Sequence, residues 1–450
     1  MQRLYEAQAY DTGQWPDSHW ARTAPPLLPC PPLTGHEKAE VAIIGAGYAG
    51  LNAALELAER FDTRAMVLDA GQPGWGASGR NGGFACAGGT KLNDAAIARR
   101  CGADGLAAFH DFQNAAIARV ADNLHRYGID ADRGPEGELL LAHSARAWAR
   151  MQREAPAAQL RDRDALRREG LFAPGFHGGV LQPQGFPLHP LKYARGLAQA
   201  ALNAGVRICG DSPVTGLARA GHGWRLTTPQ GQLDARRVLV ATNGYSADDL
   251  PPWLRGRYMP ALSCIMVTRP LSTQEQAAQG WTGQVMAYDS RHLLHYFRLL
   301  PCGRFLFGMR GGLSADPVRL RVLEAEARRH FERLFPAWAH VETESRWSGL
   351  VCLTGSLAPF CAEVPGAPGL FAALGWHGNG VAPASEGGRR IAAAMAGQPN
   401  PAPALMQMVP RRFPLPRLRR LWLRLAYAGL ALRDGPVRAA PAPAQGGRKA

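Results

Sequence analysis

Residues 41–50 read VAIIGAGYAG, and this stretch decides the fold. Its four leading apolar residues predict a buried parallel strand, and glycines at 45, 47 and 50 follow directly. The first glycine allows a tight turn, the second lets backbone approach a pyrophosphate, and the third lets the next helix pack close to the strand. A second strand ends at Asp69, about 20 residues on, where a carboxylate accepts ribose hydroxyls. This order of elements predicts a binding site for an adenine dinucleotide.

A second glycine-rich stretch, GWGASGRNGG at residues 74–83, follows the acid. Its hydroxyl, guanidinium, amide and many backbone N–H groups could lie along an extended ligand. A simple NAD dehydrogenase has no need of this second cradle. The alternative is an ordinary surface loop, because glycine, serine and asparagine are typical of loops.

The two stretches together resemble the FAD-dependent D-amino-acid oxidase (DAO) superfamily, and most closely its bacterial gamma-glutamylputrescine oxidase branch. The resemblance continues through LHPLKYARGLAQAALNAGVRI (188–208), RRVLVATNGYS (236–246), HLLHYFRLLPCGRFLFGMRGG (292–312), RWSGLVCLT (346–354) and GLFAALGWHGNGVAPASEGGRRIA (369–392). It implies FAD as the cofactor. It also implies an α/β fold, with a Rossmann-like FAD-binding domain around a central parallel sheet and an α+β substrate domain around an antiparallel sheet.

The resemblance also suggests a domain division. Segments 39–95, 188–255 and 346–400 are expected to form a discontinuous FAD-binding domain, and 96–187 and 256–345 the substrate domain. A leader (1–38) is expected to drape over the surface with Trp20 packed, and a disordered tail (435–450) to follow a C-terminal helical segment (401–434). The patterns predict helices over 93–126, 319–335 and 384–396, and a hairpin turn at 301–303.

The residues expected to hold FAD lie in the glycine-rich stretches, in the second FAD-domain segment and in the loop 375–381. They are Gly45, Ala46, Gly47, Tyr48, Gly50, Asp69, Ala77, Ser78, Arg80, Asn81, Gly82, Gly83, Val214, Gly375, Trp376, His377, Gly378, Asn379, Gly380 and Val381. Phe84 stands where relatives often carry glutamine, and His377 and Asn379 replace a more usual serine and histidine. These departures alter the polar groups expected to face the flavin. The loop 375–380 precedes a predicted helix, whose N-terminus would stabilise negative charge on the reduced flavin.

Substrate contacts are expected from the antiparallel strands that cover the flavin, at Tyr288, Tyr296, Arg298 and Arg310. Tyr296 and Arg298 share one side of a strand, because strand side chains alternate with period two. An arginine fork suits a substrate carboxylate, although each arginine could equally lie at a surface or domain interface. Lys91 could assist oxygen reduction beside the flavin, and Cys352 could anchor it covalently. Because the mechanism needs no obligatory base, no catalytic residue is assigned.

The formal charge of +15 is the excess of 51 basic over 36 acidic residues, and only four of the basic residues are lysines. The arginines are dispersed and form no stripe before residue 411, so no nucleic-acid partner is expected. Eight cysteines without a C-x-x-C pair predict neither a zinc site nor a dithiol motif, and no metal site is expected. The N-terminal residues are polar and no apolar run is long enough to span a bilayer, so a cytoplasmic location is expected.

Residues 410–435 are basic and amphipathic, which is consistent with two arrangements. The segment could lie on a membrane surface. Alternatively, it is a terminal helix that packs Leu418, Leu421, Leu425 and Leu432 onto the body. The family resemblance favours packing, so membrane association is not expected.

Three functions remain open. The first is oxidation of a C–N bond in a primary or secondary amine, such as a gamma-glutamylated polyamine, which would place the enzyme in polyamine catabolism. Hydride would pass to flavin N5, and water would hydrolyse the imine. The second is an amino-acid oxidase or dehydrogenase of the same fold, and the third an accessory flavoprotein subunit. The partners are thus a small amine or amino acid and an electron acceptor, either O2 or another molecule.

Overall fold

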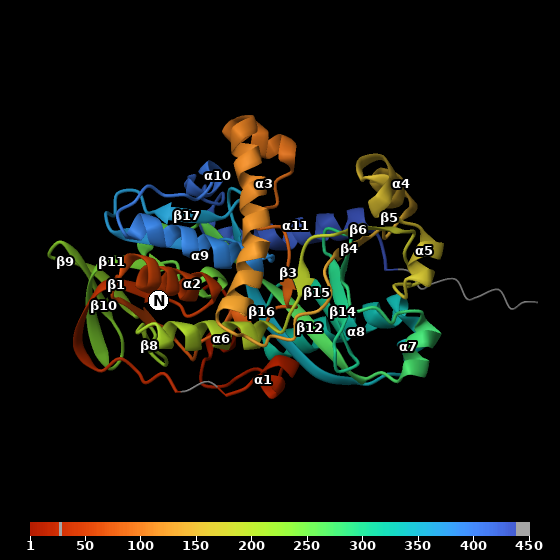
Figure 1. Ribbon diagram of the computed structural model, residues 1–450, viewed down its shortest axis with the longest axis horizontal. Helices are drawn as coiled ribbons and strands as arrows, with labels where there is room; N and C mark the ends of the chain where they lie inside the picture. The colour runs from red at the N-terminus through yellow and green to blue at the C-terminus, as the bar shows by residue number, and fades with distance from the viewer. Residues whose placement is uncertain (27–28, 438–450) are drawn as a thin grey trace, which may run out of the picture.

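The computed structural model describes residues 1–26 and 29–437, folded around two large sheets (Figure 1). The first contains β1 (Gly35–Ile44), β2 (Ala65–Leu68), β8 (Arg207–Cys209), β9 (Gly216–Ala220), β10 (Gly223–Thr227), β11 (Gly231–Val240), β17 (Phe360–Glu363) and β18 (Leu370–Leu374). Its main order is β17-β18-β11-β1-β2-β8, and all neighbours except β17 and β18 run parallel. This is the predicted Rossmann-like domain.

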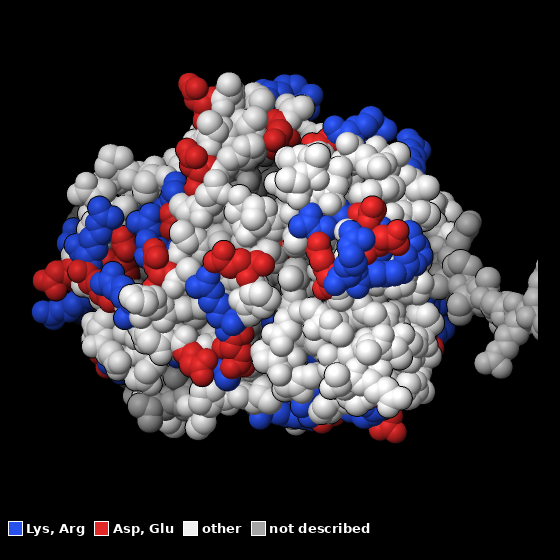
Figure 2. Space-filling view, turned by 45° about the vertical axis from the view of Figure 1, so that its right-hand side comes forward, with Lys and Arg blue, Asp and Glu red and all other residues white. Residues whose placement is uncertain are grey.

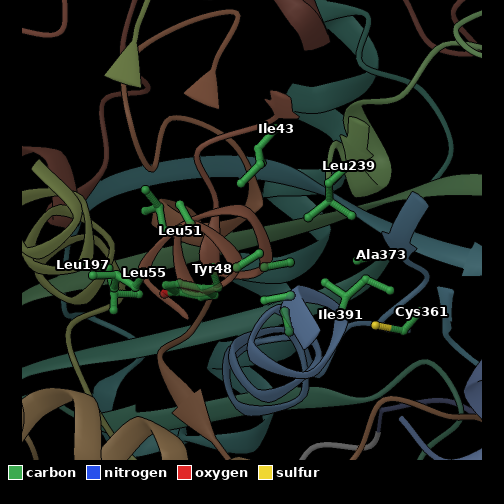
Figure 3. Close-up of a cluster of buried hydrophobic side chains, with 14 of the residues drawn as sticks. Ile43, Tyr48, Leu51, Leu55, Leu197, Leu239, Cys361, Ala373 and Ile391 are labelled. Carbon is green, nitrogen blue, oxygen red and sulfur yellow. The ribbon is translucent and has the colours of Figure 1, made fainter. Parts of the chain in front are cut away.

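Three helices, α2 (Tyr48–Phe61), α6 (Pro190–Asn203) and α9 (Val381–Met395), pack against one face of this sheet. Strand β2 and the carboxyl-terminal ends of β1 and β11 are buried on both faces, because the opposite face is also covered. Figure 3 shows the helix-side core, where side chains from the sheet meet side chains from all three helices. They include Ile43, Leu239, Ala373, Leu51, Leu55, Leu197 and Ile391.

The second sheet has the order β16-β12-β15-β14-β13-β4-β6-β5. Its strands are β4 (Glu138–Leu141), β5 (Leu160–Arg161), β6 (Gly179–Gln182), β12 (Tyr258–Pro270), β13 (Met286–Asp289), β14 (His295–Leu299), β15 (Arg304–Gly312) and β16 (Thr343–Thr354). Only β13 and β4 pair in parallel. This is the predicted antiparallel substrate sheet.

The remaining elements connect or cover the sheets. They are α1 (His19–Thr23), β3 (Phe84–Ala85), α3 (Asp94–Arg126), α4 (Ala145–Glu154), α5 (Arg163–Arg168), β7 (Phe186–Pro187), α7 (Thr273–Gln279), α8 (Pro317–Leu334), α10 (Ala404–Gln407) and α11 (Arg419–Asp434). β3 and β7 pair with each other. Helix α3 stands upright in Figure 1 and packs against α9, and Gly102 interrupts its helical dihedrals.

Several boundaries differ from those predicted. The turn at 301–303 does join β14 to β15, as expected. However, β16 begins the third segment assigned to the FAD domain, and it pairs with β12 in the substrate sheet instead. Helix α9 begins at Val381 rather than near 384, directly after the glycine-rich loop. The helix can begin before Pro383 because proline is tolerated in the first turn, where its missing N–H would have no partner within the helix.

The N-terminal leader is more deeply integrated than a surface drape. Tyr5, Tyr10 and Trp20 are buried, and Trp20 is 2% exposed, as expected of a packed residue. The Trp20 indole donates to the carbonyl of Asn81, 2.9 Å away, in the second glycine-rich stretch. The leader thus supports the predicted cofactor loop.

The described surface carries charges of both signs. On the face in Figure 2, blue and red side chains lie close to each other rather than forming a field of one sign. Within the described residues, no helix is long and apolar enough to cross a membrane. The same part of the chain contains no group of three or more His, Cys, Asp or Glu side chains that could hold a metal.

One packing prediction is wrong. Leu418, Leu421, Leu425 and Leu432 do not pack onto the body: they are exposed, with Leu425 at 54% and Leu432 at 85%. Helix α11 buries Arg419, Leu423 and Asp434 instead. Of the predicted disordered tail, only residues 435–437 are among those described.

Candidate cofactor and substrate site

One large cavity, of about 430 Å³, lies where the two sheets meet. Its lining comes from the carboxyl ends of β1, β2 and β11, from the loop 74–82, from strands of the substrate sheet and from the loop 376–381. Ligands in open α/β sheets bind beyond the carboxyl ends of parallel strands. The cavity therefore lies where the sequence motif predicts a dinucleotide.

The first glycine-rich turn has the geometry that the motif requires. Gly45 has φ +112°, and a Cβ there would lie 2.9 Å from the carbonyl oxygen of Ala241. Gly47 caps α2 without a side-chain hydrogen bond, so the helix N-terminus opens toward the cavity. A Cβ at Gly50 would lie 2.0 Å from the carbonyl oxygen of Gly45. Gly50 therefore sets the approach of α2 to β1, and the α2 N-terminus can attract a phosphate.

Asp69 lines the cavity at the end of β2. Its two oxygens accept hydrogen bonds from the backbone N–H of Ala46, 2.6 Å away, and of Gly71, 2.9 Å away. Burial raises its pKa, and these two backbone hydrogen bonds oppose the rise. The acid thus holds the glycine turn in shape and keeps further lone pairs for ribose hydroxyls.

The polar side chains of the second glycine-rich stretch mostly hold the stretch itself. Ser78 Oγ accepts from the N–H of Tyr48 at 3.0 Å, which ties the loop to the start of α2. Asn81 donates to the carbonyls of Ala77 and Ser78 and accepts from the N–H of Gly83. Arg80 lies over the Trp75 ring, 4.0 Å from its centroid. The loop is therefore pre-organised beside the cavity.

Arg298 is the one expected substrate contact that the structure places elsewhere. Its buried guanidinium donates to the carbonyl oxygens of Gly82, at 3.1 Å, and Leu188, at 2.6 Å. It shares a side of β14 with Tyr296, as predicted, but it does not line the cavity. Arg298 therefore holds the loop from behind, and its guanidinium does not face the substrate cavity.

We expect Arg298→Met to lower the free energy of unfolding by about 3 kcal/mol, because two buried carbonyls lose their donor. FAD should dissociate more readily, while the substrate KM of the FAD-loaded enzyme stays unchanged. Urea unfolding and flavin fluorescence on release measure the two effects. The matched control is Arg346→Met, at an exposed arginine of β16. A raised KM with normal stability would instead return Arg298 to the substrate site.

The loop 375–380 brings the N-terminus of α9 to the cavity. Gly380 caps this helix without a side-chain hydrogen bond, and Val381 and Ala384 of its first turn line the cavity. Asn379 faces inward and its Oδ1 accepts from Arg310 at 3.3 Å. His377 turns away: its Nε2 lies 3.2 Å from Thr354 Oγ1, and burial lowers its pKa to about 3. Of the three departures from the family pattern, Phe84 and Asn379 line the cavity and His377 does not.

Most of the expected FAD contacts line the cavity. They are Gly45, Ala46, Gly47, Tyr48, Asp69, Ala77, Ser78, Arg80, Asn81, Gly82, Val214, Trp376, Gly378, Asn379, Gly380 and Val381. Gly50, Gly83, Gly375 and His377 support the lining from behind. Cys352 is fully buried in the core of the FAD domain, where burial raises its pKa to about 12, and it does not line the cavity.

The substrate-sheet wall of the cavity contains residues that the sequence did not single out. Tyr288, Tyr296 and Arg310 line it as expected, and Tyr296 lies 3.0 Å from Ser263 Oγ. Glu138 and Cys86 line it too. The only signal for Glu138 was an acid at the start of an otherwise apolar strand, ELLL.

Glu138 is 6% exposed, and burial raises its pKa to about 7. The Cys86 thiol hydrogen-bonds to it and partly opposes this rise. Lys91 borders the cavity, and surrounding protein together with the Arg310 charge lowers the pKa of its amine to about 7. The wall therefore carries the Glu138 carboxyl beside Cys86, and the cationic groups of Lys91 and Arg310 close to each other.

The leader also reaches the cavity, through Met1, Arg3 and Tyr10. The Arg3 guanidinium lies over the Tyr10 ring, 4.4 Å from its centroid. Tyr10 packs edge-on against Tyr245, at 6.2 Å between centroids. The leader, which was expected to drape over the surface, therefore forms part of the cavity wall.

The residues present fit FAD. The cavity is continuous, and the N-termini of α2 and α9 face it from different segments. The first suits a pyrophosphate and the second the anionic edge of a reduced flavin. The turn 45–47, Asp69 and the loop 77–82 would hold the adenosine diphosphate half, and the loop 376–381 the isoalloxazine.

Comparisons with known proteins agree with this geometry. A family model described as "DAO: FAD dependent oxidoreductase" matches residues 40–394. The chain is 32% identical to a probable oxidoreductase OrdL of Rhizobium meliloti, over 93% of this chain and 98% of that protein. It is 29% identical to gamma-glutamylputrescine oxidoreductase of Escherichia coli, over the same shares.

Glycine oxidase from Geobacillus kaustophilus has a similar structure. Its TM-score is 0.68 at 21% identity, and the match covers 84% of this chain and all of that one. This likeness supports the fold alone. Because the family model spans most of the chain, and because the cavity fits its cofactor, the protein belongs to the DAO family of FAD-dependent oxidoreductases.

Proposed function

We propose that the protein oxidises the C–N bond of an amine, with Glu138 receiving the substrate's ammonium group. The observation that carries this proposal is the buried Glu138 carboxyl in the cavity wall. Burial raises its pKa and so disfavours its charged form. Among the described residues, no lysine or arginine forms an ion pair with Glu138, and the Cys86 thiol is its hydrogen-bond partner. A buried acid without a cationic partner favours binding of a cationic ligand.

FAD, when bound, supplies the acceptor for a hydride at its N5. The chain's own residues must make the amine nitrogen neutral, because its lone pair has to form the imine as the hydride leaves. A carboxylate at Glu138 can take that proton, since its pKa of about 7 is close to neutrality. The N-terminus of α9 would favour the negative charge that develops on the cofactor.

The substrate we favour is a gamma-glutamylputrescine-like amine, an assignment that would place the enzyme in polyamine catabolism. It rests on the similarity to the Escherichia coli gamma-glutamylputrescine oxidoreductase and on the two charge types in the wall. Such a molecule carries both an amine and a carboxylate. Glu138 would bind the amine, and Arg310 with Lys91 would attract the carboxylate.

The second candidate is oxidation of an amino acid. Arg310 favours it as well, because its guanidinium lies in the cavity wall and donates to Asn379. The two candidates differ in where the carboxylate lies relative to the reacting carbon. O2 or another acceptor would reoxidise the enzyme in either case.

We expect anaerobic titration with gamma-glutamylputrescine to bleach the flavin absorbance, and air to restore it. Arg310→Met should weaken bleaching by this carboxylate-bearing amine about 100-fold and leave bleaching by putrescine or monoamines unchanged, because only the former loses a charge partner. Bleaching by α-amino acids alone would favour the second candidate. A flavin that no amine or amino acid bleaches would contradict both and point to an accessory subunit.

We also propose a cytoplasmic location. The exposed Cys302 and the half-buried Cys101 are free thiols. Free accessible thiols suit a reducing compartment.

A further inference from the structure

Helix α11, dark blue in Figure 1, presents an apolar surface to solvent that the rest of the molecule does not cover. Twelve large apolar side chains are exposed in the described part of the chain, and eight of these lie between residues 408 and 432. They are Met408, Val409, Leu415, Leu418, Leu421, Trp422, Leu425 and Leu432. Concentration in one segment distinguishes them from the scattered exposed residues of an ordinary surface.

The helix has two separate apolar stripes. At about 100° per residue, the positions 419, 423, 427, 430 and 434 share one side, and 418, 421, 422, 425 and 432 share another. The first side faces the body: Arg419, Leu423 and Asp434 are buried, and Tyr427 packs beside Met259 and Ala261 of β12. The second, which we call the outer stripe, is exposed along its whole length.

Arginines lie on both sides of the outer stripe. On the helical wheel of α11, position 424 lies on one side of it and position 433 on the other, and Arg417 lies in the turn just before the helix. All three side chains are exposed, and within the described residues none forms an ion pair, unlike Arg419 with Asp248 and Arg420 with Glu6. The sequence has no Asp or Glu between residues 400 and 433. The face is therefore both apolar and uniformly cationic.

A separate groove adjoins the start of the helix. Arg255, Arg412, Arg417 and Arg419 line it with Gln2, Asp248 and Pro416, and its volume is about 260 Å³. The Asp248 carboxylate forms an ion pair with Arg419. Three exposed guanidiniums around one recess can bind an anionic phosphate group.

We propose that the outer stripe and the arginine groove dock the enzyme onto an anionic lipid bilayer. Leucines and a tryptophan between flanking arginines form the pattern of a helix that lies in the bilayer interface, with its apolar side in the acyl boundary and its cations at the headgroups. The groove would receive a lipid phosphate. The helix need not span the bilayer, and no helix in the described residues could.

A second copy of the chain fits this face less well. In a twofold dimer the same patch meets itself, so each cationic rim would oppose another and find no acid. Anionic headgroups supply the missing charge instead. The proposal is independent of which amine the enzyme oxidises.

The test is flotation of the full-length, FAD-loaded protein with lipid vesicles. We expect it to float with vesicles of phosphatidylcholine and phosphatidylglycerol (3:1) and to stay unbound with phosphatidylcholine alone. Raising the salt concentration should weaken binding, because headgroup attraction is screened. Equal flotation with both vesicle types, or none with either, would overturn the proposal.

Two variants separate the apolar and cationic contributions. Leu425→Glu should lower the vesicle partition constant at least about tenfold, because a buried leucine contributes that much in transfer free energy. Arg412→Gln with Arg417→Gln should lower it about thirtyfold. The matched control is Val322→Glu, at an equally exposed apolar residue of α8, which should bind as the parent does.

Amine-dependent flavin bleaching should be unchanged in all these variants, which shows that they are folded and separates this proposal from the proposed function. Sedimentation without lipid identifies the alternative occupant. A stable dimer that Leu425→Glu dissociates, together with no vesicle binding, would assign the outer stripe to self-association and overturn the lipid proposal.

Discussion

Gly50→Ala should abolish FAD retention and lower the free energy of unfolding by about 3 kcal/mol or more. The added Cβ would lie 2.0 Å from the carbonyl oxygen of Gly45 and 3.1 Å from a methyl group of Ile43. A backbone oxygen cannot move aside as a flexible side chain can, so α2 would have to shift away from β1. Overpacking of this kind costs about 1–3 kcal/mol, occasionally more, and the shift would also displace the helix N-terminus from the cofactor's phosphates.

Urea unfolding and the ratio of flavin to protein absorbance measure these two effects. Gly429→Ala is the matched control, because Gly429 is also helical and has open space where the Cβ would lie. This variant should raise the free energy of unfolding by about 0.5–1 kcal/mol, since alanine loses less backbone entropy in a helix than glycine. If Gly50→Ala keeps its FAD and its stability, the close approach of α2 and β1 is not what Gly50 provides.

Glu138→Gln should lower the second-order rate constant for flavin reduction by the amine about 100-fold. The glutamine keeps the size of the side chain but removes the charge that pairs with the ammonium, and loss of one partner from a buried charge pair costs about 2–5 kcal/mol. Anaerobic stopped-flow absorbance measures the rate. Glu136→Gln, at an exposed acid two residues earlier, is the control and should leave the rate unchanged.

The pH dependence supplies a second readout. The pKa of Glu138 is raised to about 7, so the side chain is a neutral acid below this pH and a carboxylate above it. The second-order rate constant for flavin reduction by the amine should therefore rise as the pH increases through about 7, because it reports the free enzyme, and this step should be absent in Glu138→Gln. The same profile in parent and variant would show that another group controls the step, and Lys91, with its pKa lowered to about 7, would be the next to test.

Features that depend on local sequence could be predicted. The strand, glycines and acid of residues 41–69 need only backbone dihedrals, side-chain size and order along the chain, and the structure has each of them where expected. The same holds for the hairpin turn between β14 and β15. The burial of Trp20 was expected from the family resemblance and not from local sequence. The cofactor loops were recognisable because close approach to a ligand requires glycine.

Features that depend on which distant segments meet in the fold could not be predicted from the sequence. Glu138 was one acid among 36 acidic residues until the parallel pairing of β4 with β13 placed it beside Cys86 and Tyr288. Arg298 lies on the predicted side of its strand, yet the carbonyls of Gly82 and Leu188 bind it, and no local pattern reveals these partners.

Helix α11 shows the same division within one element. The sequence by itself determined a basic helix with leucines at helical spacing, because periodicity is a property of the chain alone. From the sequence alone the all-apolar side with Leu421 and Leu425 is the one expected to pack, but the structure packs the side that carries Arg419 and Asp434. The buried ion pair of Arg419 with Asp248 and the hydrogen bonds of Asp434 to His292 orient the helix, and they leave the outer stripe facing solvent.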